Sequence, residues 1–306
     1  MRKIKVLALM LVLVASVSAQ KVKLTLNLNK GQEYNQNMDS KITISQQVSG
    51  MTMDIGMDIK GVMAFVVDEV SNEGYDMSVR YKSLTMKMDL PTGVMEYSSE
   101  KGDLNDIFSG ILGSMVNKTF YITMLKSGRI KEVRNVDVLF GSMFENFPNV
   151  PEAQLKQIKK QLKDAYGAKA LKGNMEMVTS VFPEKPVAVG DTWNVDTDME
   201  SGFAAKMNSV YKYMGQDEGC YLIEGNSKIN TVDKDVYVEN NGMKMKYNMK
   251  GSLVSKIKVD KKTGWIVEAK IDQEMKGTTE IQSNAQMPNG MSIPMEMKNK
   301  MTVTGE

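Results

Sequence analysis

Histidine is absent from this chain of 306 residues, and cysteine occurs once, as Cys220. Without histidine there is no Ser-His-Asp or Cys-His activation of a nucleophile, no imidazole general base and no imidazole metal ligand. A single cysteine cannot form an internal disulfide bond. These absences disfavour hydrolase chemistry. We therefore expect a protein that is not an enzyme, with no catalytic residues, no metal site and no cofactor.

Long apolar runs are scarce as well. The clear one, Val6–Val14, follows three basic residues, precedes a small-residue cleavage site at Val17–Ala19 and is too short to span a bilayer comfortably. Residues 1–19 are therefore predicted to be a secretory signal peptide. We expect an exported protein, periplasmic or extracellular, that is not an integral membrane protein.

Neither sign of charge is in excess. The chain has 39 basic and 37 acidic residues, and Arg2, Lys3 and Lys5 belong to the predicted signal peptide. Subtracting these three leaves 36 basic against 37 acidic residues, a net charge of about −1. A chain without a basic excess lacks the electrostatic footprint of nucleic-acid binding, so we expect no nucleic-acid partner. The sequence identifies no protein partner.

Methionine is plentiful, with 28 residues against 18 leucines. Its flexible, polarizable side chain suits irregular apolar surfaces. In the segment Met243–Val259, apolar or small residues occupy nearly every second position, and five lysines fall between them. A period of two over 17 residues predicts a long β-strand with one buried and one wet face.

A methionine repeat extends this pattern. The spacing M-x-M-x3-M occurs at Met51–Met57 and again at Met243–Met249. Each copy leads through a hairpin to a glycine and an aromatic residue, Gly74-Tyr75 in one case and Gly264-Trp265 in the other. We expect both aromatics to occupy equivalent hairpins and to point to the buried face. A change of parity predicts a β-bulge near Lys82-Ser83.

The coarse pattern predicts an α+β fold dominated by β-structure. We expect a large curved antiparallel sheet, either a half-barrel or two related β-meanders at about 24–98 and 209–304. Helical spacing between about 103 and 172 predicts a mainly helical middle segment, whose helices would pack on the buried face. Residues 20–306 are expected to form a single β-rich domain.

Three stretches carry a family resemblance: Leu24–Tyr34, Phe182–Trp193 and Val259–Trp265. They resemble members of an uncharacterised family of exported proteins from Gram-negative bacteria, a domain of unknown function. The resemblance implies no particular activity. More distantly, the predicted sheet with helices is similar to the open half-barrels of periplasmic lipoprotein carriers, a similarity at the level of fold alone.

A methionine-rich face suggests a binding surface. The leading hypothesis is non-enzymatic binding of a lipid or another apolar or amphipathic ligand in a Met-lined concavity. The candidate ligand-binding residues are Met51, Met53, Met57, Met243, Met245, Tyr247 and Met249. One alternative is a structural or interaction module whose packed core holds no ligand. Another is a Cu(I)-binding protein, because soft thioether sulfurs favour Cu(I).

Overall fold

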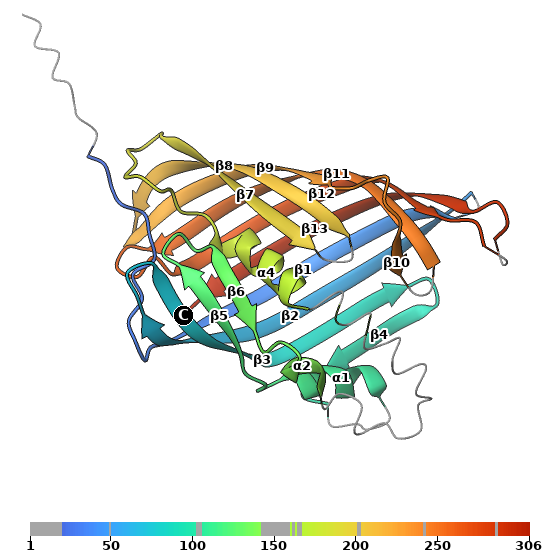
Figure 1. Cartoon of the computed structure of the whole chain (residues 1–306), viewed down its shortest axis with the longest axis horizontal. Coiled ribbons are helices and arrows are strands. Elements are labelled where there is room, and N and C mark those ends of the chain that lie inside the picture. The colour runs from blue at the N-terminus through green and yellow to red at the C-terminus, as the bar shows by residue number, and fades with distance from the viewer. Residues whose placement is uncertain are drawn as a thin grey trace, which may run out of the picture.

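One strongly curved antiparallel sheet of 13 strands dominates the molecule (Figure 1). The computed structural model describes residues 20–306 except 49, 102–105, 142–159, 161–162, 164–166, 201–202, 241–242 and 285–286. Within these residues the sheet is not closed, because its edge strands are not hydrogen-bonded to each other. No helix in the described part of the chain is long and apolar enough to cross a membrane. The predicted β-dominated α+β fold is confirmed.

The strands follow the chain closely in their spatial order. Their bounds are β1 (Glu33–Val48), β2 (Met51–Val70), β3 (Gly74–Leu90), β4 (Gly93–Ser98), β5 (Phe120–Leu125), β6 (Ile130–Arg134), β7 (Thr192–Glu200), β8 (Ala204–Asp217), β9 (Cys220–Thr231), β10 (Val238–Asn240), β11 (Met243–Asp260), β12 (Ile266–Ile281) and β13 (Met291–Gly305). The order across the sheet is β6-β5-β3-β2-β1-β13-β12-β11-β9-β8-β7, with β4 beside β3 and β10 beside β11. Strands β1 and β13 therefore join the two halves of the chain.

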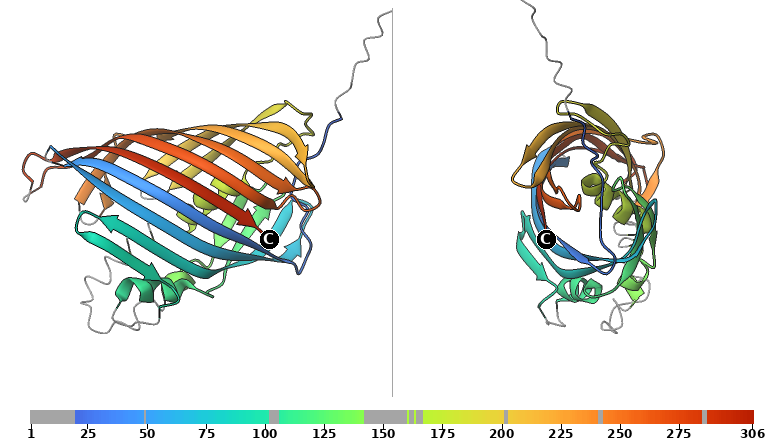
Figure 2. Two further views of the ribbon diagram at one scale, coloured as in Figure 1. Left: turned by 180° about the vertical axis from the view of Figure 1, so that it is seen from behind. Right: turned by 90° about the vertical axis from the view of Figure 1, so that its left-hand side faces the viewer.

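Strand β11 shows how the sequence produces a sheet with two different faces. Leu253, Ser255, Ile257 and Val259 are buried, and the three residues that alternate with them are exposed. All five lysines of the predicted strand alternate with this buried set. The strand predicted for Met243–Val259 is confirmed. We call the side that carries the buried set the inner face; it is the concave side of the sheet in Figure 2.

The predicted bulge in β3 is also confirmed. Val62 of β2 lies opposite Ser83, whereas the next residue, Met63, lies opposite Tyr81. Lys82 is therefore the extra residue, and the alternation of β3 changes phase there. The shift lets residues on both sides of the bulge keep their apolar side chains on the inner face.

The sheet has two distinct ends. At the near end, on the left of Figure 1, lie the turns before Gly74 and Ile266 and the first described residues of the chain. At the far end, on the right, lie the turns that follow Val48, Leu90 and Ile281. The near end holds the densest core, and the far end holds most of the candidate methionines.

The first predicted meander begins later than residue 24, because β1 begins at Glu33 and Leu24–Leu28 is not a strand. This segment crosses the near end of the sheet without joining its ladder, and only an isolated bridge at Val22 precedes it. Leu24, Leu26 and Leu28 are nevertheless buried, because any extended chain places alternate side chains on one side. The Leu26 amide donates to the Lys126 carbonyl at 2.9 Å, so the segment is held by turns rather than by strands.

The two predicted aromatics both face the core, as expected. Tyr75 and Trp265 follow the turns between neighbouring antiparallel strands and are 2% and 4% exposed. The Tyr75 hydroxyl donates to the Leu26 carbonyl at 3.0 Å and accepts from the Leu28 amide at 3.1 Å. The Trp265 indole contacts Tyr34, with 5.1 Å between ring centroids. The duplication that suggested these positions stays a prediction.

Helix α4 (Ala168–Thr179) lies inside the curve of the sheet and contacts both edge strands, β6 and β7 (Figure 2). The other described helices are α1 (Ile107–Met115), which contacts β3 and β4, and α2 (Val138–Gly141). The middle segment was predicted to be helical to about residue 172, whereas α4 extends to Thr179. Residues 142–166 of the predicted helical segment lie outside the described residues apart from Lys160 and Lys163.

Candidate functional site

The seven candidate residues share the inner face but form two separate groups. Met51, Met53 and Met57 lie on β2, and the other four lie on β11. Strands β1, β13 and β12 lie between these groups. The registers place inner residues of the intervening strands between them: Met53 is opposite Gln46, which is opposite Met295. The candidates are therefore parts of one wider surface.

Burial falls along β2, β11 and β13 toward the far end, whereas the inner face of β12 is still buried at Thr279 and Ile281. On β2 the inner side chains change from fully buried at Phe65, through half-buried at Met57, to 72% exposed at Met51. On β11, Val259 is fully buried and Met245 is half-buried. On β13, Val303 and Met301 are buried, and Met297, Met295 and Met291 are half-buried. The same face is thus a core at the near end and an accessible apolar surface at the far end.

We call this accessible surface the far inner face. Besides the candidates it contains Ile42, Ile44, Ile55, Met86, Met88, Met291, Ile293, Met295 and Met297. Sequence reasoning did not select these nine as ligand-binding residues. Their alternation was visible in the sequence, but only the strand order and register bring them beside the candidates.

Met249 differs from the other candidates because it is only 4% exposed, at the inner boundary of this surface. Tyr247, one inner position further out, is half-buried and stacks on Phe203, with 5.1 Å between ring centroids. Met53, at 38% exposed, lies near the turn between β1 and β2. A ligand on this surface would therefore contact Tyr247, Met245 and Met57 more readily than Met249.

A band of buried polar side chains crosses the inner face from β1 to β8. Its members are Ser40, Asn299, Gln273, Ser255, Ser227 and Ser209. The Ser40 hydroxyl donates to Asn299 Oδ1 at 2.8 Å, and the hydroxyls of Ser209 and Ser227 are 2.7 Å apart. Among the described atoms, Ser255 Oγ has no hydrogen-bond partner. On β13 the half-buried methionines begin directly beyond this band, whereas on β8, β9, β11 and β12 buried apolar residues continue past it, at Met207, Ile229, Met249 and Met275.

Electrostatics on the inner face are set by burial. The pKa of Tyr211 is raised to about 12 because the buried phenol is withdrawn from water, so this side chain is neutral at physiological pH. Burial also raises the pKa of Glu176 on α4, although its carboxylate accepts a hydrogen bond from the Ile130 amide.

Within the described chain, no group of three or more His, Cys, Asp or Glu side chains could hold a metal ion.

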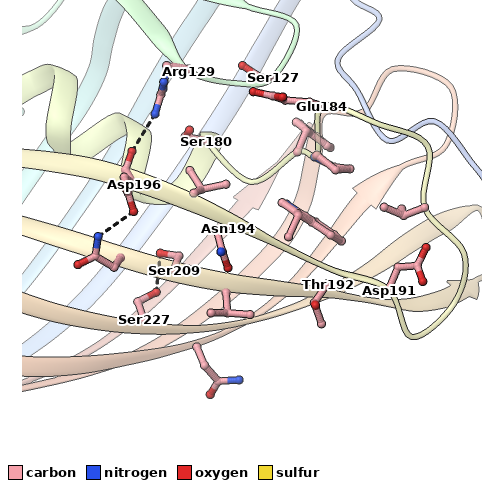
Figure 3. A pocket seen from close by; sticks show the side chains of 18 of the residues that line it. Ser127, Arg129, Ser180, Glu184, Asp191, Thr192, Asn194, Asp196, Ser209 and Ser227 are labelled. Carbon is pink, nitrogen blue, oxygen red and sulfur yellow. Dashed lines mark hydrogen bonds between the residues drawn. The ribbon is translucent and has the colours of Figure 1, made fainter.

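A cleft of about 1660 Å³ opens beside the edge strand β7 (Figure 3). It is lined by β7, β8 and β9 and by the loop that contains Phe182. Arg129 donates to the Asp196 backbone carbonyl at 2.9 Å, and Asn208 donates to the Asp196 carboxylate at 2.7 Å. The cleft contains none of the methionine candidates, and sequence reasoning did not find it. Its hydrogen bonds join the loop before β6 to the sheet edge.

No curated protein matches the chain in sequence. Among solved structures, one chain of lipovitellin, described by its lipid–protein interactions, is similar with a TM-score of 0.49 and 8% identity, and the match covers 92% of this chain and 25% of that chain. An outer membrane channel from Pseudomonas putida F1 has a TM-score of 0.24 and 8% identity, with 92% and 97% covered. An outer membrane lipoprotein-sorting protein domain from Vibrio parahaemolyticus has a TM-score of 0.14 and 6% identity, with 87% and 83% covered.

The family resemblance seen in the sequence is confirmed by a family model. That model matches residues 72–266, from the turn before β3 to the first residue of β12. It covers the middle helices and two of the three stretches that carried the resemblance. The chain belongs to the family of unknown function DUF6263.

Proposed function

We propose that the protein binds an apolar or amphipathic ligand, such as a lipid, on the far inner face. The observation that carries this proposal is the fall in burial along β2, β11 and β13 on a single face of the sheet. Burying apolar surface yields roughly 25 cal/mol per Å², so a half-exposed methionine surface gains free energy from an apolar ligand. Large exposed apolar surfaces on soluble proteins commonly mark binding sites.

The side-chain chemistry supports a ligand of variable shape. Methionine is unbranched and polarizable, and it adapts to different apolar partners better than leucine does. Along β13, the nine residues from Met291 to Asn299 of the polar band span about 27 Å, at about 3.4 Å for each of the steps between them. This length suits an extended hydrocarbon chain. All five lysines of β11 lie on the outer face, so they provide no charge to bind an ionic group at this surface.

The proposal is a non-enzymatic one. The far inner face is supplied with thioethers, aliphatic groups and the Tyr247 ring, and none of these is a common proton-transfer or nucleophilic group with a matched partner. The proposal also holds that the protein is exported. This part depends only on the sequence of residues 1–19. An enzymatic activity that disappears on substitution of one carboxylate would overturn the non-enzymatic part.

Native mass spectrometry of the protein purified without detergent tests the proposal. We expect a bound mass that organic solvent extracts, on a chain that begins at Gln20. The triple variant Met57→Gln, Met245→Gln, Met297→Gln should lose this mass, because amides replace thioethers across the face. The control Met214→Gln changes an exposed methionine at the bulge of β8 and should keep it.

Two results would contradict this proposal. The first is a bound mass that the triple variant retains as fully as the control does. The second is a folded wild-type protein with no bound mass that also takes up no hydrophobic dye. The second result would favour the structural module, in which the face serves only as a partner surface or packed layer.

A specific observation supports Cu(I) binding as a second candidate function. Met57, Met88 and Met95 lie directly opposite one another on β2, β3 and β4. Opposed side chains on one face have Cβ atoms roughly 5 Å apart, which lets neighbouring thioethers approach one ion. Met95 is 42% exposed, so the row can be reached from solvent. Soft sulfur ligands favour Cu(I).

Competition with a Cu(I) chelator tests this second candidate. The double variant Met88→Leu, Met95→Leu should lose Cu(I), whereas Met243→Leu, Met245→Leu, a pair on the distant strand β11, should retain it. Leucine keeps a similar volume, so each change should cost under about 1.5 kcal/mol of stability. Equal Cu(I) retention by wild type and by the Met88 variant would exclude this row as the site.

A further inference from the structure

The far end of the sheet displays large apolar side chains on turns that are usually polar. Of the 16 large hydrophobic side chains recorded as exposed in the described chain, eight lie there. They are Met51, Met53, Val94, Met95, Val232, Val236, Tyr237 and Val238. We call these eight residues the far rim. A soluble surface carries single exposed apolar residues routinely, but a concentration at one end indicates an interaction site.

The far rim is built from three separate turns. Met51 follows the turn between β1 and β2, Val94 follows the turn between β3 and β4, and Val236 lies in the connection from β9 to β10. Figures 1 and 2 show these turns projecting from the same end of the sheet. The most exposed side chains are those of Met51 at 72%, Val94 at 57% and Val236 at 56%. The turns can therefore meet one extended surface together.

The charges near the far rim do not form a basic patch. Lys87 pairs with Glu96 at 3.3 Å, and Lys246 pairs with Glu280 at 2.9 Å while its ammonium lies 5.5 Å from the Tyr237 ring centroid. Asp233 and Asp235 flank the third turn. Anionic membranes and polyanions are recognised by clustered lysine and arginine, which this end does not provide. The chemistry instead fits an apolar layer beneath uncharged or zwitterionic headgroups.

From these observations we propose that the far rim inserts into the surface of a lipid bilayer with zwitterionic headgroups. Separate apolar tips suit a fluid surface, which adapts to each tip, better than a rigid protein surface, which would need one contiguous complementary patch. Tyr237 supplies the amphipathic ring that is favoured at a membrane interface. This inference stands on the far rim alone and does not require a ligand on the far inner face.

Flotation with vesicles of pure phosphatidylcholine tests this inference. We expect the wild-type protein to float with these vesicles and to do so equally well at high salt, because insertion is apolar. The triple variant Met51→Asp, Val94→Asp, Val236→Asp should reduce the bound fraction at least tenfold. The control Val189→Asp alters a 62% exposed valine in the loop before β7 and should bind as the wild type does.

Three results would overturn the inference. They are failure of the wild-type protein to float, binding that requires anionic lipid and disappears with salt, and an equal loss in the Val189→Asp control. Circular dichroism melts identify any unfolded variant, and single aspartates at Met51 or Val236 then replace the triple variant. Retained uptake of Nile red by the double variant Val94→Asp, Val236→Asp, which leaves the candidate methionines unchanged, would separate failure of this inference from failure of the proposed ligand site.

Discussion

The carboxylate of Glu176 accepts a hydrogen bond from the backbone amide of Ile130 at 2.7 Å. Glu176 lies on α4, and Ile130 opens the edge strand β6. One turn further along α4, the Thr179 hydroxyl donates to the Gly128 carbonyl at 2.7 Å. On the other side, Gly173 lies so close to β7 that an added Cβ would be 2.8 Å from the Asp198 carbonyl. Helix α4 thus joins the two free edges of the sheet.

Glu176 should make stability depend on pH in a direction opposite to that of most carboxylates. Its pKa is raised from 4.5, chiefly by burial, against the influence of the Ile130 hydrogen bond and of Lys172 and Arg129. A raised pKa means that the ionised form is disfavoured in the folded state, so the penalty is full above the folded pKa. The penalty shrinks as the pH falls toward 4.5.

The variant Glu176→Gln keeps an acceptor for the Ile130 amide and removes the ionisation. We expect its free energy of unfolding to equal or exceed that of the wild type at pH 7, with the difference narrowing as the pH falls. Glu176→Ala should cost about 1–3 kcal/mol because the Ile130 amide is left unpaired. Urea denaturation over a pH series measures both effects. Parallel pH profiles for wild type and Glu176→Gln would contradict the prediction.

Tyr75 fixes the first described segment to the near end of the sheet. Tyr75→Phe removes the donor to the Leu26 carbonyl and the acceptor for the Leu28 amide. Leaving these buried groups unpaired should cost about 1–3 kcal/mol. The same change at Tyr121, which is 40% exposed on β5, should cost roughly 0.5 kcal/mol or less. Thermal melts compare the two variants, and equal losses would mean that the Tyr75 hydroxyl contributes nothing.

Adjacent positions on β11 test the two faces of the sheet. Leu253 is 2% exposed on the inner face, and Val254 is 49% exposed on the outer face. Leu253→Asp buries an unpaired charge, so we expect it to cost roughly 4 kcal/mol or more and to unfold the protein at ordinary temperature. Val254→Asp should remain within roughly 0.5 kcal/mol. Similar destabilisation by both variants in chemical denaturation would argue against a one-faced sheet.

Periodicity in the sequence was enough to predict strand β11 and the bulge at Lys82. An alternation with a period of two shows which side chains share a face of the sheet, and the structure keeps this alternation. It does not state how deeply each position is covered. Met51 and Val259 obey the same alternation, yet one is 72% exposed and the other is fully buried. Depth depends on what the rest of the chain places over each end of the sheet.

The features that sequence reasoning missed depend on distant segments. Helix α4 has Gly173 and Asn174 near its centre, which weakens its local signal, and it is stabilised by contacts with both sheet edges. The segment around Leu26 alternates as a strand would, but turns at Lys126 and Thr263 supply its hydrogen bonds. The cleft at β7 likewise forms only when the loop before that strand folds back beside it.

The most direct measurement is a Nile red titration of the folded protein, because it reports accessible apolar surface without knowledge of the natural ligand. We predict saturable fluorescence for wild type and for Met214→Gln. The triple variant Met57→Gln, Met245→Gln, Met297→Gln should bind roughly tenfold more weakly, a loss of about 1.4 kcal/mol. Absence of saturable binding by folded wild type, or equal affinity in all three proteins, would contradict a ligand site on the far inner face.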